Sequence, residues 1–327
     1  MTIREVVEKK AREKYSDNSY VKNRIEKELC YFEKNDRFKE IETLLKIKES
    51  IKDQNVFVFP TGMLSLYLLD LDFINPMPAH YYSSNTKELI FDDSALYGVD
   101  LPIKEDFYRD GFNITEEYVL NLTKDLHFEV YLYEKYIDIV KEIVSESFDI
   151  TVETEESKKN GYKEKIYFAK TSIIFNDYSV EEFFGKNLQR DVSLENFSKY
   201  LSEDAANRLM EDEAKSIKIN SFKDMIEILA LSKLSLTDGS NKFEEFVAPK
   251  FPKTREDIFI YFNKEGYSLE ESSDLAYKIS FGQNPKINIK DKEIKKYFES
   301  IQYAWPKSVI VSIFLRDYFK SCMWIIY

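Results

Sequence analysis

Glycine is scarce in this sequence. The chain has 327 residues and contains 8 glycines, whereas glycine makes up about 7% of an average protein. Loops that wrap phosphate groups need glycine, because a side chain would keep the backbone N–H groups away from the ligand. The chain therefore has few places where a glycine-rich phosphate loop can form.

Cysteine and histidine are rarer still. The two cysteines, Cys30 and Cys322, lie far apart with no CxxC motif, and the two histidines are His80 and His127. This excludes a cysteine-rich zinc site and indicates a reducing compartment. We expect both cysteines to be small buried or half-buried residues without a disulfide partner.

Long apolar segments are also missing. The N-terminal segment is charged from its fourth residue and has no apolar stretch typical of a secretory signal. The longest apolar run near the C-terminus, residues 309–315, is interrupted by Ser312 and followed by Arg316, which is far short of the roughly 20 residues that a bilayer requires. We therefore expect a cytoplasmic protein with no membrane partner.

Negative charge outweighs positive charge, with 59 Asp and Glu against 47 Lys and Arg and a formal net charge of −12. Such a field repels polyanions, so nucleic-acid binding would need a local basic patch. The 25 Phe and 23 Tyr residues occur throughout the chain rather than alternating with such a patch. We expect them mainly in the core, for which 43% hydrophobic residues suffice.

The first half of the chain predicts helices followed by strands. Residues 4–52 have apolar positions at helical spacing, with a break at 16–19, and the apolar run 56–59 predicts a buried strand. Residues 126–132 alternate as a strand does and continue into an amphipathic helix. Two strand-like arms around Asn160 and Gly161 predict a long β-hairpin over about residues 148–170.

The second half predicts short helices, at 180–187, 194–212, 221–232, 254–264, 268–280, 291–303 and 307–324. The whole pattern indicates an α+β fold that is predominantly helical and contains a small mixed sheet. It divides into a helical part at 1–55, a mixed α/β part at 56–178 and a helical part at 179–327.

Five segments resemble, in the same order, parts of the PolC-type DNA polymerase III alpha subunit, a bacterial C-family polymerase. They are KAREKYSDNSYVKNRIEKEL (10–29), FINPMPAHY (73–81), SFKDMIEILALS (221–232), REDIFIYFNKEG (255–266) and YAWPKS with DYFK (303–308 and 317–320). The resemblance covers roughly residues 5–110 and 215–327. It implies that the three parts correspond to a thumb, a nucleotidyltransferase-like palm and fingers.

The catalytic strand of that family is altered in this chain. Family members hold two Mg²⁺ ions with carboxylates of a palm strand, and the best match, LHFEVY (126–131), places His127 and Glu129 at the two aspartate positions. Two residues apart on a strand, they would project to one face. A neutral imidazole, however, removes a charge and a hard oxygen ligand. No third aspartate matches, so we expect no metal site.

The positions that contact the incoming nucleotide are altered as well. FPTGMLSLY (59–67) keeps Gly62 but lacks the family's arginine, and SFGQ (280–283) replaces Arg-Lys-Gly-Lys. In YAWPKSV, Lys307 is kept and Val309 takes the position of a histidine. Together these changes remove cations from around the phosphates of a bound nucleotide.

Three cations on the last predicted helix, Lys307, Arg316 and Lys320, are candidate contacts to nucleic acid or nucleotide. Alternatively, these three cations form an ordinary solvated helix face. In the same way, Glu129 and His127 can belong to an ordinary strand with a half-exposed polar face.

The segment FINPMPAHY predicts a rigid strap. Its two prolines fix φ and favour extended conformations at Asn75 and Met77. No carboxylate or cysteine lies at metal-ligand spacing from His80. We expect this histidine to be a structural hydrogen-bonding residue or part of the wall of a cleft.

The leading hypothesis is a catalytically degenerate PolC-like protein without a cofactor. It would act as a DNA- or replisome-binding module in a bacterial, phage or mobile-element context, with primer-template DNA or a replisome protein as its partner. One alternative is an active DNA-directed DNA polymerase or nucleotidyltransferase that uses Mg²⁺ at an unorthodox site formed by Glu129 and His127. A second is a protein-interaction or toxin-like inhibitor of replication that does not bind DNA.

Overall fold

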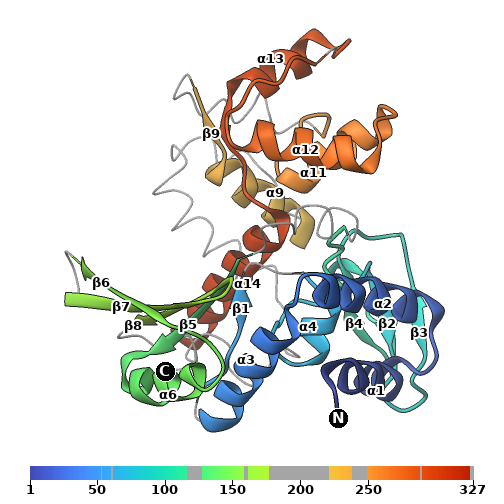
Figure 1. Cartoon of the computed structure of the whole chain (residues 1–327). Coiled ribbons are helices and arrows are strands. Elements are labelled where there is room, and N and C mark those ends of the chain that lie inside the picture. The colour runs from blue at the N-terminus through green and yellow to red at the C-terminus, as the bar shows by residue number, and fades with distance from the viewer. Residues whose placement is uncertain are drawn as a thin grey trace. The chain divides into compact units, whose positions relative to one another are not determined.

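The computed structural model describes residues 1–52, 54–59, 62–115, 127–157, 161–176, 221–237, 249–287 and 289–324. In these residues helices and small sheets form an α+β fold, as the sequence predicts (Figure 1). The chain divides into two compact units. Unit 1 contains Met1–Asp93, Pro102–Asn113 and the described residues of Thr123–Gln189, and unit 2 contains Ser94–Leu101 and the described residues of Ile114–Leu122 and Arg190–Tyr327.

Three helices begin unit 1: α1 (Ile3–Tyr15), α2 (Ser19–Lys34) and α3 (Phe38–Ser50). Thr2 and Glu5 form a capping box at the start of α1, and the Asn18 side chain caps α2, so the predicted break at 16–19 is confirmed. The structure has a second break, at 35–37, which the sequence analysis does not predict.

The five-stranded sheet of unit 1 has the order β1-β5-β8-β7-β6. Its strands are β1 (Val58–Phe59), β5 (Phe128–Tyr133), β6 (Thr151–Ser157), β7 (Gly161–Phe168) and β8 (Thr171–Asn176). Strands β5 and β8 are parallel, and the other neighbours are antiparallel. The predicted hairpin is β6–β7, whereas β8, which returns the chain to the side of β5, is not predicted.

Helices α3 and α6 (Ile137–Ser145) pack beside the sheet, and a 3₁₀ turn, η3 (Glu134–Tyr136), leads from β5 into α6. The guanidinium of Arg37 on α3 lies 4.0 Å from the ring centroid of Phe128. Glu40 on the same helix accepts hydrogen bonds from Lys170 N at 3.0 Å and Thr171 Oγ1 at 3.1 Å. These contacts attach α3 and its N-cap residue Arg37 to β5 and to the start of β8.

A short helix and a small second sheet complete unit 1. The helix is α4 (Leu64–Leu68), and the sheet has the order β3-β2-β4, with β2 (His80–Tyr82), β3 (Leu89–Phe91) and β4 (Tyr108–Asp110). In this sheet His80 pairs with Phe91 on one side and with Asp110 on the other. The last two residues of the proline-containing strap, His80 and Tyr81, thus belong to the middle strand.

Unit 2 is mainly helical in the described residues. Its elements are η1 (Gly98–Asp100), α9 (Phe222–Lys233), β9 (Ser235–Leu236), α11 (Arg255–Lys264), α12 (Leu269–Ser280), α13 (Lys292–Ser300), β10 (Ile301–Tyr303) and α14 (Lys307–Trp324). Four predicted helices are confirmed, but the one predicted at 291–303 ends at Ser300 and continues as β10. The helices predicted at 180–187 and 194–212 lie outside the described residues.

Side-chain caps define the helix starts of unit 2. Ser221, Thr254 and Ser268 each accept a hydrogen bond from a backbone N–H in the first turn of the helix that follows. The carboxylate of Asp100 also accepts hydrogen bonds from Phe222 N at 2.6 Å and Lys223 N at 3.0 Å. The η1 segment is thereby tied to the start of α9.

The environment of Cys30 differs from the expectation. This cysteine is exposed rather than buried, because it lies on the outer side of α2, where its thiol donates to Glu26 Oε1 at 3.2 Å. The side chain of Cys322 lies outside the described residues. Among the described helices, none has the length and apolar character needed to cross a membrane.

Candidate functional site

Strand β5 places Glu129 on the face of the sheet opposite its buried side. Phe128, Val130 and Leu132 are buried, whereas Glu129 and Tyr131 are half-buried. The hydroxyl of Tyr131 donates a hydrogen bond to Glu129 Oε2 at 3.0 Å. The alternation of the strand therefore leaves a carboxylate and a phenol side by side on the more accessible face.

His127, which precedes β5, is exposed and contacts the neighbouring strand β8. Its Nε2 atom lies 3.0 Å from Ser172 Oγ, and Ser172 pairs with Glu129 in the parallel register. The structure thus brings both of the residues proposed as degenerate catalytic positions to the same pair of strands. Ser172, which contacts His127 and pairs with Glu129, is not marked by any of the sequence motifs.

The PolC resemblance implies two Mg²⁺ ions at this strand face, and the donor atoms present do not fit them. Two such ions require several anionic oxygen ligands. Strand β5 contains one carboxylate, Glu129, and the adjacent donors are an imidazole and two hydroxyl groups. In the described part of the chain, no group of three His, Cys, Asp or Glu side chains is placed to hold a metal ion.

The turn at Gly62, where the family contacts the nucleotide, is held by a buried ion pair. Arg24 Nε lies 3.1 Å from Glu28 Oε1, and both side chains are almost fully buried on α2. Arg24 also donates to the carbonyl oxygen of Gly62 at 3.1 Å. The Glu28 carboxylate accepts from Leu64 N at 2.9 Å and Ser65 N at 2.7 Å. The backbone amides at the start of α4 are therefore bound by the protein's own carboxylate.

The strap FINPMPAHY is buried, and His80 has the structural role expected of it. Its ring is fully buried, and Nδ1 lies 2.7 Å from the carbonyl oxygen of Pro78. Burial lowers the pKa of His80, although Asp110 and the hydrogen bond with Pro78 oppose the shift. The Asn75 side chain accepts a hydrogen bond from Met77 N at 3.2 Å, which fixes the backbone between the two prolines.

A polar cluster around Asp110 attaches the strap to its surroundings. Asp110 Oδ2 accepts hydrogen bonds from Asn75 Nδ2 at 2.7 Å and from the Tyr67 hydroxyl at 3.1 Å. Lys14 Nζ lies 2.5 Å from the same hydroxyl. Burial lowers the pKa of Lys14 and raises that of Tyr67 well above its usual value. Sequence reasoning misses this cluster because its members come from α1, α4, the strap and β4.

Lys307, a proposed contact to nucleic acid, lies inside unit 2 at the start of α14. Its side chain is 7% exposed, and Nζ lies 3.1 Å from Asp257 Oδ1 on α11. The backbone N–H of Lys307 donates to Glu256 Oε2 at 2.5 Å. Burial opposes protonation of Lys307, but the nearby charges of Asp257 and Glu256 outweigh it and raise its pKa. The ammonium group is thus already paired within the protein.

Arg316 and Lys320 lie further along α14. Their side chains are outside the described residues, so their role as contacts to nucleic acid or nucleotide stays a prediction. The structure therefore gives Lys307, the one of the three proposed cations whose side chain is described, an internal partner.

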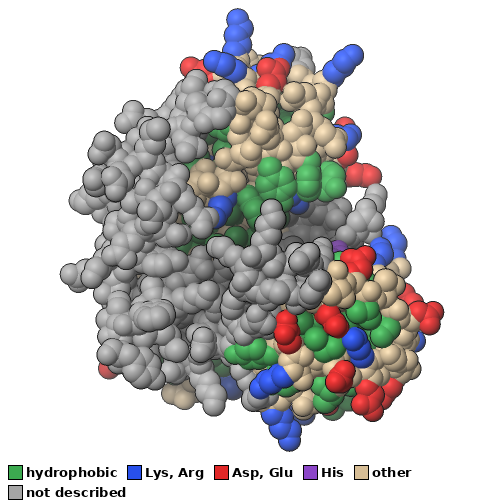
Figure 2. Space-filling model, turned by 90° about the vertical axis from the view of Figure 1, so that its left-hand side faces the viewer, with side chains coloured by type: hydrophobic (Ala, Val, Ile, Leu, Met, Phe, Trp, Pro, Cys, Tyr) green, Lys and Arg blue, Asp and Glu red, His purple; other side chains and the backbone are tan. Residues whose placement is uncertain are grey.

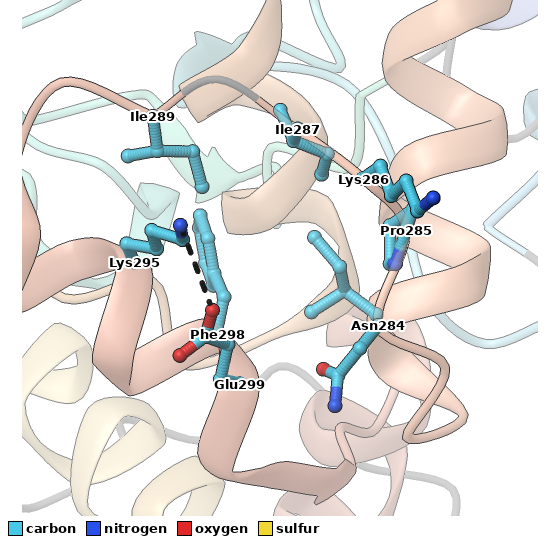
Figure 3. Close-up of a pocket in the computed structure, with 9 residues that line it drawn as sticks. Asn284, Pro285, Lys286, Ile287, Ile289, Lys295, Phe298 and Glu299 are labelled. Carbon is cyan, nitrogen blue, oxygen red and sulfur yellow. Dashed lines mark ion pairs between the residues drawn. The ribbon is translucent and has the colours of Figure 1, made fainter.

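A cavity of about 470 Å³ lies in unit 2 between the end of α12, the following loop and α13 (Figure 3). Ile279, Ile287 and Phe298 contribute apolar walls, and Lys295 forms an ion pair with Glu299 at 3.9 Å. The sequence motifs singled out above do not predict this cavity. Its walls come from Ile279 of α12, from α13 and from residues 284–287 and 289 of the loop between these helices, which we call the lysine-containing loop.

The sequence was compared with protein-family models and with curated proteins, and neither comparison found a match.

Proposed function

We propose that this protein is a catalytically degenerate PolC-like palm-and-fingers protein that binds DNA and does not transfer nucleotides. The arrangement at β5 carries the proposal. One carboxylate, Glu129, accepts a hydrogen bond from Tyr131, and the other aspartate position is the imidazole of His127, hydrogen-bonded to Ser172. Nucleotidyl transfer by two Mg²⁺ ions needs a richer set of anionic oxygen ligands than this strand offers.

The proposal assigns the sheet of unit 1 to a palm and the helices of unit 2 to fingers. It is supported by the five sequence segments that resemble the polymerase in the right order. Each of the five overlaps described elements, namely α1 with α2, the buried strap, α9, α11, and β10 with α14. In this interpretation the chain keeps the segments that shape the fold, whereas its catalytic residues have changed.

A local surplus of lysine supports DNA as the partner. Residues 276–300 contain six lysines against Asp291, Glu293 and Glu299, in a chain whose net charge is −12. Within the described residues, no ion pair involves Lys286, Lys290, Lys292 or Lys296. Figure 2 shows Lys and Arg side chains projecting at the top of the view, the end at which Figure 1 places α13. Such a surface suits a phosphate backbone.

A primer-extension assay with Mg²⁺ and with Mn²⁺ tests the loss of catalysis. We expect no template-directed incorporation by the wild-type protein. Incorporation that the substitution Glu129→Ala abolishes would establish an active polymerase with an unorthodox site and would overturn this part of the proposal.

Binding of a labelled primer-template duplex at several salt concentrations tests the DNA contact. The affinity should fall as salt rises, and the double substitution Lys290→Ala/Lys292→Ala should reduce the slope by about 1 for each lost phosphate contact. Lys264→Ala removes an exposed lysine of α11 outside this segment and serves as the matched control. Absence of any salt-dependent binding would contradict DNA as the partner and favour a protein partner.

A further inference from the structure

Four aromatic side chains in unit 2 form a connected row, which we call the aromatic row: Tyr277, Phe281, Tyr303 and Trp305. Successive ring centroids lie 4.7 Å, 5.4 Å and 5.3 Å apart. Two of these rings belong to the exposed large hydrophobic side chains among the described residues, since Tyr277 is 46% and Phe281 is 42% exposed. The expectation that Phe and Tyr belong mainly to the core thus fails at this place.

The backbone around the aromatic row is fixed by close contacts. Tyr277 and Phe281 are one turn apart at the end of α12, so they lie on the same side of the helix. The Ala304 N–H donates to the carbonyl oxygen of Ser280 at 3.0 Å, which joins the end of α12 to the segment after β10. Gly282 has φ +69, and a Cβ there would lie 3.0 Å from the carbonyl oxygen of Gln302. The backbone that carries the rings is therefore fixed by contacts within unit 2.

A buried cation lies behind the exposed rings. Arg255 is 8% exposed, and its guanidinium carbon lies 4.8 Å from the Phe281 ring centroid and 5.9 Å from that of Tyr277. Its Nε atom is buried and has no hydrogen-bond partner. Because this atom is buried, a ligand on the exposed rings cannot reach it. The accessible faces of Tyr277 and Phe281, with a cation close to them, suit a ligand that has flat π faces.

The lysines that follow the aromatic row in the sequence indicate which class of flat ligand is suitable. Phe281 leads directly into the lysine-containing loop with Lys286, and Lys290 and Lys292 follow. This loop and α13 line the cavity in Figure 3 together with Ile279 of α12, the helix that carries Tyr277 and ends just before Phe281. Hydrophobic and basic side chains are both visible on the described surface of unit 2 in Figure 2. Bases that stack and phosphates that pair with lysine are the two components of a single nucleic-acid strand.

We propose that the aromatic row binds unpaired bases of single-stranded DNA, with the lysines of residues 278–296 contacting the phosphates. This inference rests on the proposed function and gives the DNA-binding module a specific site. Stacking on Tyr277 and Phe281 requires no pairing partner and tolerates any base, because every base has a π face. The site would therefore prefer single strands to duplex without a strong sequence preference.

The test is a fluorescence-anisotropy titration of the full chain with three labelled probes: an oligothymidine of about 20 nucleotides, an abasic strand of the same length and a blunt duplex. We expect Tyr277→Ala and Phe281→Ala each to weaken binding of oligothymidine about tenfold and to leave duplex binding unchanged. Leu269→Ala truncates another exposed apolar side chain of α12, which is 44% exposed, and should bind like the wild type. Tyr277→Phe should retain affinity for oligothymidine.

The outcomes separate this inference from the proposed function. If the wild type binds the abasic strand as tightly as oligothymidine, or if both alanine variants bind oligothymidine normally, the aromatic row does not stack bases and the inference is wrong. Duplex binding would then still support the proposed function. If the wild type binds none of the three probes, both proposals fail, and a protein becomes the favoured partner of the aromatic row. Because the substituted rings are exposed, an unchanged thermal unfolding midpoint should confirm that each variant is folded.

Discussion

The ammonium group of Lys307 and the carboxylate of Asp257 form an ion pair of 3.1 Å between the first turns of α14 and α11. Burial favours the neutral acid at Asp257, but the Lys307 charge and the hydrogen bond with Thr254 outweigh it and hold the pKa of Asp257 below its usual value. The pair therefore joins two helices inside unit 2. It gives Lys307 a structural role that its sequence motif does not reveal.

Lys307→Met should lower the free energy of unfolding by about 1–3 kcal/mol, because it removes the buried partner of the Asp257 carboxylate, whose own side chain is 33% exposed. The matched control is Lys278→Met, which removes the ammonium of a surface pair with Asp274 in which both side chains are more than 40% exposed. Its cost should be at most about 1 kcal/mol. Urea unfolding measures both values, and equal costs would contradict the importance of the buried pair.

Acid should destabilise the protein through His80. Its pKa in the folded protein is below the ordinary value of 6.5, so the unfolded chain takes up a proton at pH values where the folded protein does not. This contribution to stability is complete above the ordinary value and is lost as the pH falls toward the folded pKa. The groups that face the ring are Asp110, Lys14, the Pro78 carbonyl and the Asn75 amide.

Urea unfolding at about pH 7.5 and about pH 5.5 checks this dependence. His80→Gln should lose less stability on acidification than the wild type, whereas His127→Gln, which alters the exposed histidine, should retain the wild-type loss. An NMR titration of the His127→Gln variant follows His80 alone. A midpoint at or above 6.5 would contradict the prediction even if the His80 variant does not fold.

Gly111 should be essential for the strap. It has φ +102, and a Cβ there would lie 2.2 Å from the carbonyl oxygen of Pro78 and 2.8 Å from that of Met77. Gly266 has φ +92 with no atom within 4 Å, so Gly266→Ala measures the cost of the backbone conformation alone. We expect Gly266→Ala to cost about 1 kcal/mol and Gly111→Ala at least about 2 kcal/mol more. Similar costs in thermal unfolding would show that the strap can move away from β4.

Local signals were sufficient for much of the secondary structure. The capping residues Thr254 and Ser268 mark helix starts that the sequence analysis places within one residue, and the paired arms around Gly161 form the predicted hairpin. The break at 35–37 has no glycine or proline to mark it. Strand β8 is adjacent to β5 only because the chain crosses over through α6, and neighbouring residues do not encode that pairing.

The candidate sites depend more strongly on tertiary contacts. The sequence places His127 and Glu129 on one strand, but their neighbour Ser172 becomes visible only in the register of β5 and β8. The burial of Lys307 depends on Asp257, which belongs to another helix. Tyr277 and Phe281 have the spacing of a buried helix face, and only the structure shows that they are exposed.

The parallel pairing of β5 with β8 also has a consequence for the order of folding. Strands β6, β7 and β8 are successive antiparallel neighbours, so they can associate through short loops. Strand β5 can join them only after α6 and both hairpin arms have been laid down, so its pairing with β8 is less local than the pairings within the ribbon. We expect the face with Glu129 and Ser172 to be assembled only when β5 closes onto a preformed three-stranded ribbon.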